Sequence, residues 1–161
     1  MVIHDLYPEK LKVMLLIHPM LASSEPMRRY LVENILKVAD DYRYIVPDLS
    51  GHGEAMNEVY VSAAEEARIL TQYLLEHGVT KIDLGFAASL GGVVLFEMLN
   101  RGEIRFRRLF FEGVSFYENS RLGGFLMTKI MLAKQKKGRK DPKLAVKKMS
   151  KMFGQQAGEV M

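Results

Sequence analysis

Short apolar runs alternate along this chain with longer segments in which apolar residues recur every three or four positions. The short runs contain few polar residues, which is typical of strands that are buried on both faces of a sheet. The longer segments have the period of amphipathic helices. The predicted strands are 12–17, 42–46, 82–88 and 107–111, and the predicted helices are 25–38, 62–77 and 90–100.

This order predicts a three-layer α/β/α sandwich with a mostly parallel sheet. A helix between two buried strands returns the chain to the same edge of the sheet through a right-handed crossover. Residues 1–9 carry no clear pattern and are compatible with an edge strand or a tail. In a sheet of this kind, sites lie where the strands end, so the loops after the strands are the first places to search for chemistry.

Capping signals place the ends of the predicted helices. Ser24 is the expected N-cap of the first helix, with Pro26 in its first turn. The stretch 62–65, Ser-Ala-Ala-Glu, matches a capping box at the start of the second helix. Gly78 and Gly102 follow the last periodic residues of the second and third helices, where glycine commonly ends a helix.

The last fifty residues break the alternation of strands and helices. Residues 125–133 are apolar nearly all round, and residues 134–140 form a basic loop. We therefore expect two parts, an α/β core over 1–118 and a helical cap or lid over 119–161.

Positive charge is concentrated in that C-terminal part. Segment 129–151 holds ten Lys and Arg residues and one acid, whereas the whole chain has a net charge of only +4. Such a segment can bind nucleic acid or an anionic membrane surface, and salt-dependent binding would reveal it. Aromatic residues do not interleave with its charges, which favours a solvated face of the cap, so no nucleic-acid partner is expected.

The composition excludes several classes of chemistry. The chain has no cysteine, which rules out disulfides, thiolate metal sites and cysteine nucleophiles. A cysteine-free chain without a recognisable signal peptide fits a cytoplasmic location. No apolar run is long enough to predict a membrane span.

Ser89 is the strongest candidate for chemistry. It stands between the predicted strand 82–88 and the predicted helix 90–100, among the small residues of Ala-Ala-Ser-Leu-Gly, 87–91. A serine on a sharp strand-to-helix turn projects its hydroxyl above the sheet, and the helix that starts there directs free N–H groups at a developing oxyanion. A strand–helix turn of small residues without any chemistry is the alternative.

Three stretches together resemble the α/β-hydrolase family. They are Val-Met-Leu-Leu-Ile-His-Pro-Met at 13–20, Val-Pro-Asp-Leu-Ser-Gly-His-Gly at 46–53 and Ala-Ala-Ser-Leu-Gly-Gly at 87–92. In order and spacing they are similar to that family's strand ending in His-Gly, its Asp-x-x-Gly-His-Gly loop and its nucleophile elbow. The resemblance covers roughly residues 10–118, and the segment after Phe116 falls where these enzymes insert a helical cap.

The resemblance implies a role for each matched position. Ser89 would be the nucleophile, and the backbone N–H groups of Leu90 and Met20 would be the oxyanion donors. Pro19 replaces the family's usual glycine in the oxyanion loop. Glu112, at the end of the fourth predicted strand, would be a fallback acid that orients a histidine, although a solvated strand-end residue is the simpler interpretation.

The resemblance also leaves a gap, because no histidine follows Ser89 in the sequence. Members of the family usually continue with strands that carry the acid and then the histidine of the triad. We therefore expect an incomplete hydrolase fold. The implied activity is that of a serine hydrolase acting on a small apolar ester or related acyl compound, with no cofactor and no metal. The alternative is a truncated, inactive binding or interaction module.

Two further expectations concern histidines and partners. His18, Asp48 and His52 follow neighbouring strands, where they could bind a metal, although hydrogen bonds that structure the loops are favoured. His4 and His77 are expected at the surface or at a helix cap. An incomplete sheet would leave an exposed edge, so homo-oligomerisation through that edge or the cap helix is possible.

Overall fold

The computed structural model describes residues 1–114 together with residues 129, 133, 140, 141 and 143. The chain divides into two compact units, Met1–Ser115 and Phe116–Met161. All helices and strands with defined bounds lie in the first unit. The predicted cap over 119–161 falls almost wholly outside the described residues.

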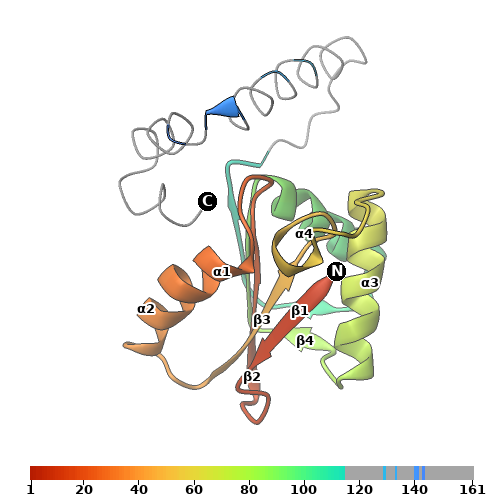
Figure 1. The fold of residues 1–161 in the computed structure, drawn as a ribbon. Coiled ribbons are helices and arrows are strands. Elements are labelled where there is room, and N and C mark those ends of the chain that lie inside the picture. Colours follow the sequence, from red (N-terminus) through yellow and green to blue (C-terminus); the bar gives the residue numbers. More distant parts are fainter. Residues whose placement is uncertain (115–128, 130–132, 134–139, 142, 144–161) are drawn as a thin grey trace. The chain divides into compact units, whose positions relative to one another are not determined.

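Five strands form the main sheet of the first unit, in the order β1-β3-β2-β5-β7. Figure 1 labels β1, β2 and β3 of this sheet. The four neighbours from β3 to β7 run parallel, and β1 joins β3 antiparallel. Two short strands, β4 and β6, pair separately and in parallel. The strands are β1 Val2–Leu6, β2 Lys12–Ile17, β3 Tyr42–Asp48, β4 Lys81–Ile82, β5 Leu84–Ala88, β6 Arg105–Phe106 and β7 Leu109–Glu112.

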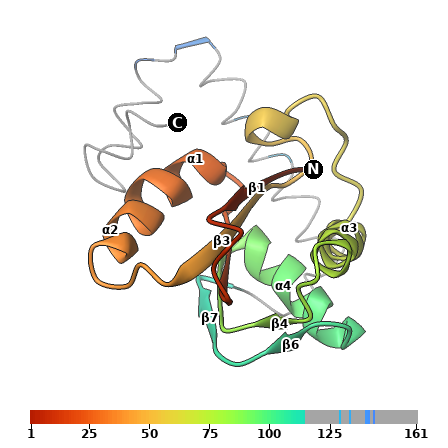
Figure 2. The ribbon, with the colours of Figure 1, turned by 90° about the horizontal axis from the view of Figure 1, so that it is seen from below.

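Helices lie on both sides of this sheet, as Figure 2 shows. On one side are α3, Ala63–Glu76, and α4, Leu90–Arg101; on the other are α1, Ser24–Pro26, the π-helical turn η1, Met27–Val32, and α2, Glu33–Leu36. Side chains of β2 alternate between the two layers. Leu15 and Ile17 pack with α3 and α4, while Met14 and Leu16 pack with η1. The predicted mostly parallel α/β/α arrangement is confirmed.

Three predicted strands have different bounds in the structure. The predicted strand 82–88 is divided at Asp83, whose carboxylate accepts the Val13 N–H at 3.2 Å and the Lys81 ammonium at 2.7 Å. The predicted strand 107–111 is shifted to β7, Leu109–Glu112, and the short strand β6, Arg105–Phe106, lies before its predicted start. Strand β3 is longer than predicted, because the pairing with β1 continues to Asp48 after the pairing with β2 has ended.

The caps of the helices partly match the prediction. The prediction that Ser24 caps the first helix is wrong: Ser23 is the N-cap, and Ser24 is buried inside α1 with its N–H 2.6 Å from Asp48 Oδ1. The Ser62 cap is confirmed, since its hydroxyl accepts the Glu65 N–H at 3.1 Å. Gly102 ends α4 in the left-handed conformation, at φ 69°, as its position predicted.

An ion-pair network fixes the edge strand β1, which the sequence pattern left unassigned. Arg43 on β3 donates to both carboxylate oxygens of Asp5 on β1, at 2.8 and 2.5 Å. The Tyr73 hydroxyl on α3 also donates to Asp5, at 2.9 Å. Burial and the hydrogen bond to Asp5 raise the pKa of Tyr73 to about 12.

Candidate functional site at Ser89

Ser89 sits at the junction of β5 and α4 in a backbone conformation that is rare for a residue with a side chain. Its φ is 46° and its ψ is −111°. Such a conformation costs on the order of 1–3 kcal/mol and persists only where neighbours enforce it. Here the Ser89 N–H donates to the Glu112 carbonyl at 2.9 Å, and the Gly92 N–H donates to the Ser89 carbonyl at 3.0 Å. The side chain is exposed and makes no capping bond to α4.

The two glycines after Leu90 allow α4 to start directly against neighbouring strands. A Cβ on Gly91 would lie 2.6 Å from the Ile17 carbonyl oxygen and 2.7 Å from that of His18. A Cβ on Gly92 would collide with the Val114 side chain. The first turn of α4 therefore touches the end of β2, which places the start of that helix beside the loop that follows Ile17.

The N-terminus of α4 gives this site its electrostatic character. The first N–H groups of a helix have no acceptor within the helix, and the helix dipole adds positive potential there. The N–H of Leu90 belongs to this group, and it directly follows Ser89. An oxygen that gains negative charge at this position would be stabilised by donors that are already in place.

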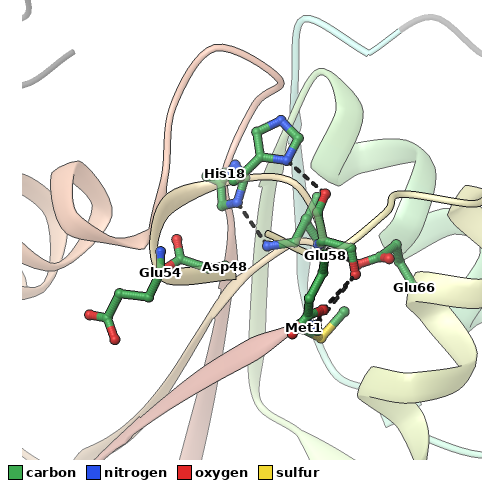
Figure 3. Close-up of polar contacts among 9 residues, drawn as sticks. Met1, His18, Asp48, Glu54, Glu58 and Glu66 are labelled. Carbon is green, nitrogen blue, oxygen red and sulfur yellow. Dashed lines mark hydrogen bonds and ion pairs between the residues drawn. The ribbon is translucent and has the colours of Figure 1, made fainter. Parts of the chain in front are cut away.

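His18 is a structural residue of the loop after β2. Its ring is fully buried, and both ring nitrogens are engaged. Figure 3 draws one of these two hydrogen bonds, as a dashed line from the ring. Nε2 accepts the Leu49 N–H at 3.1 Å and Nδ1 donates to the Pro19 carbonyl at 2.8 Å, which assigns the proton to Nδ1. Burial lowers the pKa of His18, so the ring is neutral at pH 7.

His52 connects the loop after β3 to the predicted oxyanion loop. Its Nε2 is 2.8 Å from the Met20 carbonyl oxygen, and its Nδ1 is 3.1 Å from the Ser50 carbonyl oxygen. The ring lies 5.1 Å from that of His18, centroid to centroid. Together the two imidazoles hold the carbonyls on both sides of the Pro19–Met20 turn. Because a peptide unit is planar, fixing the Pro19 carbonyl also fixes the direction of the Met20 N–H.

Asp48 organises the loop after β3 from a buried position. Its carboxylate accepts the N–H of Ser24 at 2.6 Å and the N–H of Glu54 at 3.0 Å, and His4 Nε2 lies 3.4 Å away. Burial alone would raise the pKa of Asp48, but these hydrogen bonds hold it below the usual range. Gly53 is required beside it, since a Cβ there would collide with the carboxylate.

The contacts of His18, Asp48 and His52 do not favour a metal site at these residues. The imidazoles bind backbone groups, as the loop-structuring interpretation expects. Among the described residues, the group whose donor atoms lie within 4.8 Å of one another is instead His4, Asp48 and Glu54. The expectation that His4 is a surface or cap residue is wrong, because its side chain is only 13% exposed and contacts Asp48. His77 does lie at a helix cap, at the end of α3.

Glu112 is adjacent to Ser89 through the main chain. It ends β7, its carbonyl accepts the Ser89 N–H, and its residue is exposed. No contact of its carboxylate with Ser89 is seen among the described residues. Its role as an acid stays a prediction, as do the roles of Ser89, Leu90 and Met20.

Sequence reasoning missed the contacts that hold the predicted oxyanion loop. Nothing in the spacing indicated that His52 would reach the Met20 carbonyl, 32 residues away. One signal was available for Asp48, since Gly53 in the Gly-His-Gly triplet marks a place where a side chain cannot fit. The contact between His4 and Asp48 could not be predicted, because the sequence pattern did not assign the strand β1 that carries His4.

Comparison with known proteins gives matches at the level of solved structures. No family model and no curated protein matches the sequence. An α/β-hydrolase family protein from Desulfitobacterium hafniense, itself described as putative, is 28% identical, over 76% of this chain and 48% of its own, with a TM-score of 0.67. A thermophilic esterase from Thermogutta terrifontis is 20% identical, over 92% and 52%, with a TM-score of 0.64. MenH from S. aureus is 23% identical, over 93% and 56%, also at 0.64.

These likenesses and the described topology show that the chain has an α/β-hydrolase fold. The chain spans about half the length of the solved structures that it matches. In the part of the chain that the structure describes, no helix is long and apolar enough to cross a membrane.

Proposed function

We propose that the chain carries the nucleophile and the oxyanion site of a serine hydrolase that acts on a small apolar ester or related acyl compound. The observation that carries the proposal is the backbone of Ser89, held at φ 46° with its side chain exposed at the start of α4. Strain of this kind at an exposed residue is typical of a functional position, since packing alone gives no reason to retain it. A solved α/β-hydrolase family protein and a solved esterase of the same fold support the reaction class.

The proposed reaction is acyl transfer to water. The Ser89 oxygen attacks the ester carbonyl as a base removes its proton, and the carbonyl oxygen becomes an oxyanion that accepts the N–H groups of Leu90 and Met20. The tetrahedral intermediate then expels the alcohol, which takes the proton from the base, and leaves an ester on Ser89. Water attacks that ester in the same way and releases the acid.

Exposed apolar side chains near the oxyanion loop support a small apolar substrate. Met20 is 47% exposed and Leu21 is 57% exposed, on the loop that would supply one oxyanion donor. We propose that they contact the acyl group. The cysteine-free sequence supports a cytoplasmic setting for this activity.

Labelling with a fluorophosphonate tests the proposal. The reagent phosphonylates serines that are both nucleophilic and close to an oxyanion site, and intact-mass analysis counts the adducts. We expect one adduct, which maps to Ser89 and is missing in Ser89→Ala. Ser23 provides an internal comparison, because it also precedes a helix but has an ordinary φ of −139°. Equal labelling of Ser23 and Ser89, or no adduct on a folded chain, would contradict the proposal.

The second candidate function is an inactive binding module. One observation favours it: all four histidines of the chain are described, and each already has a hydrogen-bond partner. A hydroxyl without a base is a poor nucleophile. A folded chain that binds small esters in a thermal-shift assay, yet gives no Ser89 adduct under any condition, would support this candidate over the enzyme.

A further inference from the structure

We propose that His4, Asp48 and Glu54 bind a zinc ion, at a site that is separate from Ser89 and does not depend on the proposed function. The three residues come from three elements: His4 from β1, Asp48 from the end of β3, and Glu54 from the 3₁₀ turn η2, Gly53–Ala55. Their donor atoms, one ring nitrogen and two carboxylate oxygens, all lie within 4.8 Å of one another. Imidazole and carboxylate groups are both common zinc ligands.

The pairing of β1 with β3 brings His4 and Asp48 to the same face of the sheet. His4 is opposite Val46 in the antiparallel register, and Asp48 follows two residues later on β3. Residues in this diagonal relation are close enough for long side chains to meet. The side chain of His4 is 13% exposed and that of Asp48 is 1% exposed. Two of the three donors are therefore fixed by the sheet and largely shielded from solvent.

Two backbone N–H groups hold the Asp48 carboxylate in position. Its Oδ1 accepts the Ser24 N–H at 2.6 Å, and its Oδ2 accepts the Glu54 N–H at 3.0 Å. Figure 3 labels Asp48 and Glu54, which lie next to each other. Each carboxylate oxygen has two lone pairs, so Oδ2 can still bind an ion. Hydrogen bonds to a ligand of this kind orient it and strengthen metal binding.

The distances around His4 fit the ligands of one ion better than they fit direct hydrogen bonds. His4 Nε2 is 3.4 Å from Asp48 Oδ2 and 3.6 Å from Glu54 Oε1. A hydrogen bond between nitrogen and oxygen usually measures about 2.7–3.2 Å. Tetrahedral ligands that are each about 2.0–2.2 Å from a zinc ion are roughly 3.3–3.6 Å apart. Binding of an ion between the donors would therefore need little movement of His4 or Asp48.

Glu54 provides the open side of the site and part of its charge. Its side chain is 62% exposed, so an ion can enter from that side and a water molecule can take the fourth ligand position. The carboxylates of Asp48 and Glu54 together match the charge of a divalent ion. Arg28 Nη2 is 3.9 Å from Glu54 Oε1, so this guanidinium competes with the ion for Glu54.

A bound ion would join the edge strand β1 to the loop that follows β3. The same loop carries His52, whose Nε2 is 2.8 Å from the Met20 carbonyl oxygen. The three donors converge only when β1 has paired with β3, so the ion binds the folded chain in preference to the unfolded one. Preferential binding of this kind raises stability by mass action. Zinc should therefore stabilise the fold.

Titration of the chelator-treated chain with zinc tests the proposal. Isothermal titration calorimetry should show one site per chain, and zinc at about ten times the dissociation constant should raise the midpoint of thermal unfolding by at least about 3 °C. His4→Gln and Glu54→Gln should each weaken binding by at least about tenfold, since the loss of a second-shell partner alone costs 10–100-fold. His77→Gln is the matched control and should bind as wild type does, because His77 lies at the end of α3 and contacts Tyr73.

The other outcomes would overturn the proposal. Glu54 is exposed, so Glu54→Gln should stay folded, and thermal unfolding without zinc checks this for every variant. Equal binding by wild type, His4→Gln and Glu54→Gln would show that zinc binds other groups. Neither heat nor a shift of the midpoint at millimolar zinc would show that the three donors do not hold the ion. Mg²⁺ prefers oxygen ligands in octahedral geometry, so a shift with Mg²⁺ as large as that with zinc would contradict a site that includes an imidazole.

Discussion

Relief of backbone strain at Ser89 gives a quantitative prediction about stability. A residue with a Cβ at φ 46° and ψ −111° costs on the order of 1–3 kcal/mol, and glycine avoids that cost. Glycine also makes the unfolded chain more flexible, which offsets about 0.4–1 kcal/mol of the gain. We therefore expect Ser89→Gly to be more stable than Ser89→Ala by about 0.5–2 kcal/mol, although both variants lose the nucleophile.

Ser23 provides the matched control for that comparison. It also stands immediately before a helix and makes no side-chain capping bond, but its φ of −139° is ordinary for any residue. Glycine at Ser23 has no strain to relieve, and it makes the unfolded chain more flexible, so the gain of glycine over alanine should be smaller at Ser23 than at Ser89. Urea unfolding measures the free energy of unfolding of all four variants, and the comparison holds where their m-values are equal. If Ser89→Gly is no more stable than Ser89→Ala, the strain argument is wrong, and with it the physical reason for treating Ser89 as a functional position.

Four further predictions follow from individual contacts. Asp48→Asn should destabilise the fold by about 1–3 kcal/mol, because an amide group replaces one of the two acceptors of buried N–H groups. The wild-type pKa of Asp48 is lowered, so its contribution to stability is present above about pH 4 and is lost as the pH falls further; a pH series of urea midpoints should be flatter in the variant. The pKa of Tyr73 is raised to about 12, so its contribution is complete below about pH 10 and is lost as the pH rises toward 12, a loss that Tyr73→Phe should remove. Thr71→Val should leave stability unchanged or raise it by about 1 kcal/mol, because among the described residues nothing hydrogen-bonds to the buried Thr71 hydroxyl; a clear loss of stability in thermal unfolding would contradict this. His52→Ala should slow fluorophosphonate labelling of Ser89 by up to about 10²-fold while the circular dichroism spectrum stays native, since it frees the loop that carries the Met20 N–H.

The fold could be predicted from the sequence wherever burial alone determines the pattern of apolar residues. Strand β2 and helix α4 begin within a residue of where the apolar pattern places them, because each is covered on most sides. Strand β1 could not be predicted in this way. Its residues are only partly buried, and its place depends on Asp5 meeting Arg43 and Tyr73, which are 38 and 68 residues away. Long-range polar pairs of this kind leave no periodic signal.

Only part of the candidate site could be predicted from the sequence. The position of Ser89 followed from the small residues that surround it and the helix that follows. The contacts that hold the predicted oxyanion loop could not be predicted, because they depend on which carbonyls His18 and His52 face once the loops have folded. The same contacts agree with the interpretation from the sequence that His18 and His52 structure the loops.

Formation of an acyl-enzyme on Ser89 is the most direct test of the account. The chain is mixed with p-nitrophenyl butyrate, quenched in acid, and analysed by intact mass and peptide mapping, with Ser89→Ala in parallel. The account predicts a butanoyl group on the peptide that contains Ser89, absent from the variant. A folded chain that carries no butanoyl group, or carries it only on lysines in wild type and variant alike, would contradict the claim that Ser89 is the nucleophile of an acyl-transfer site.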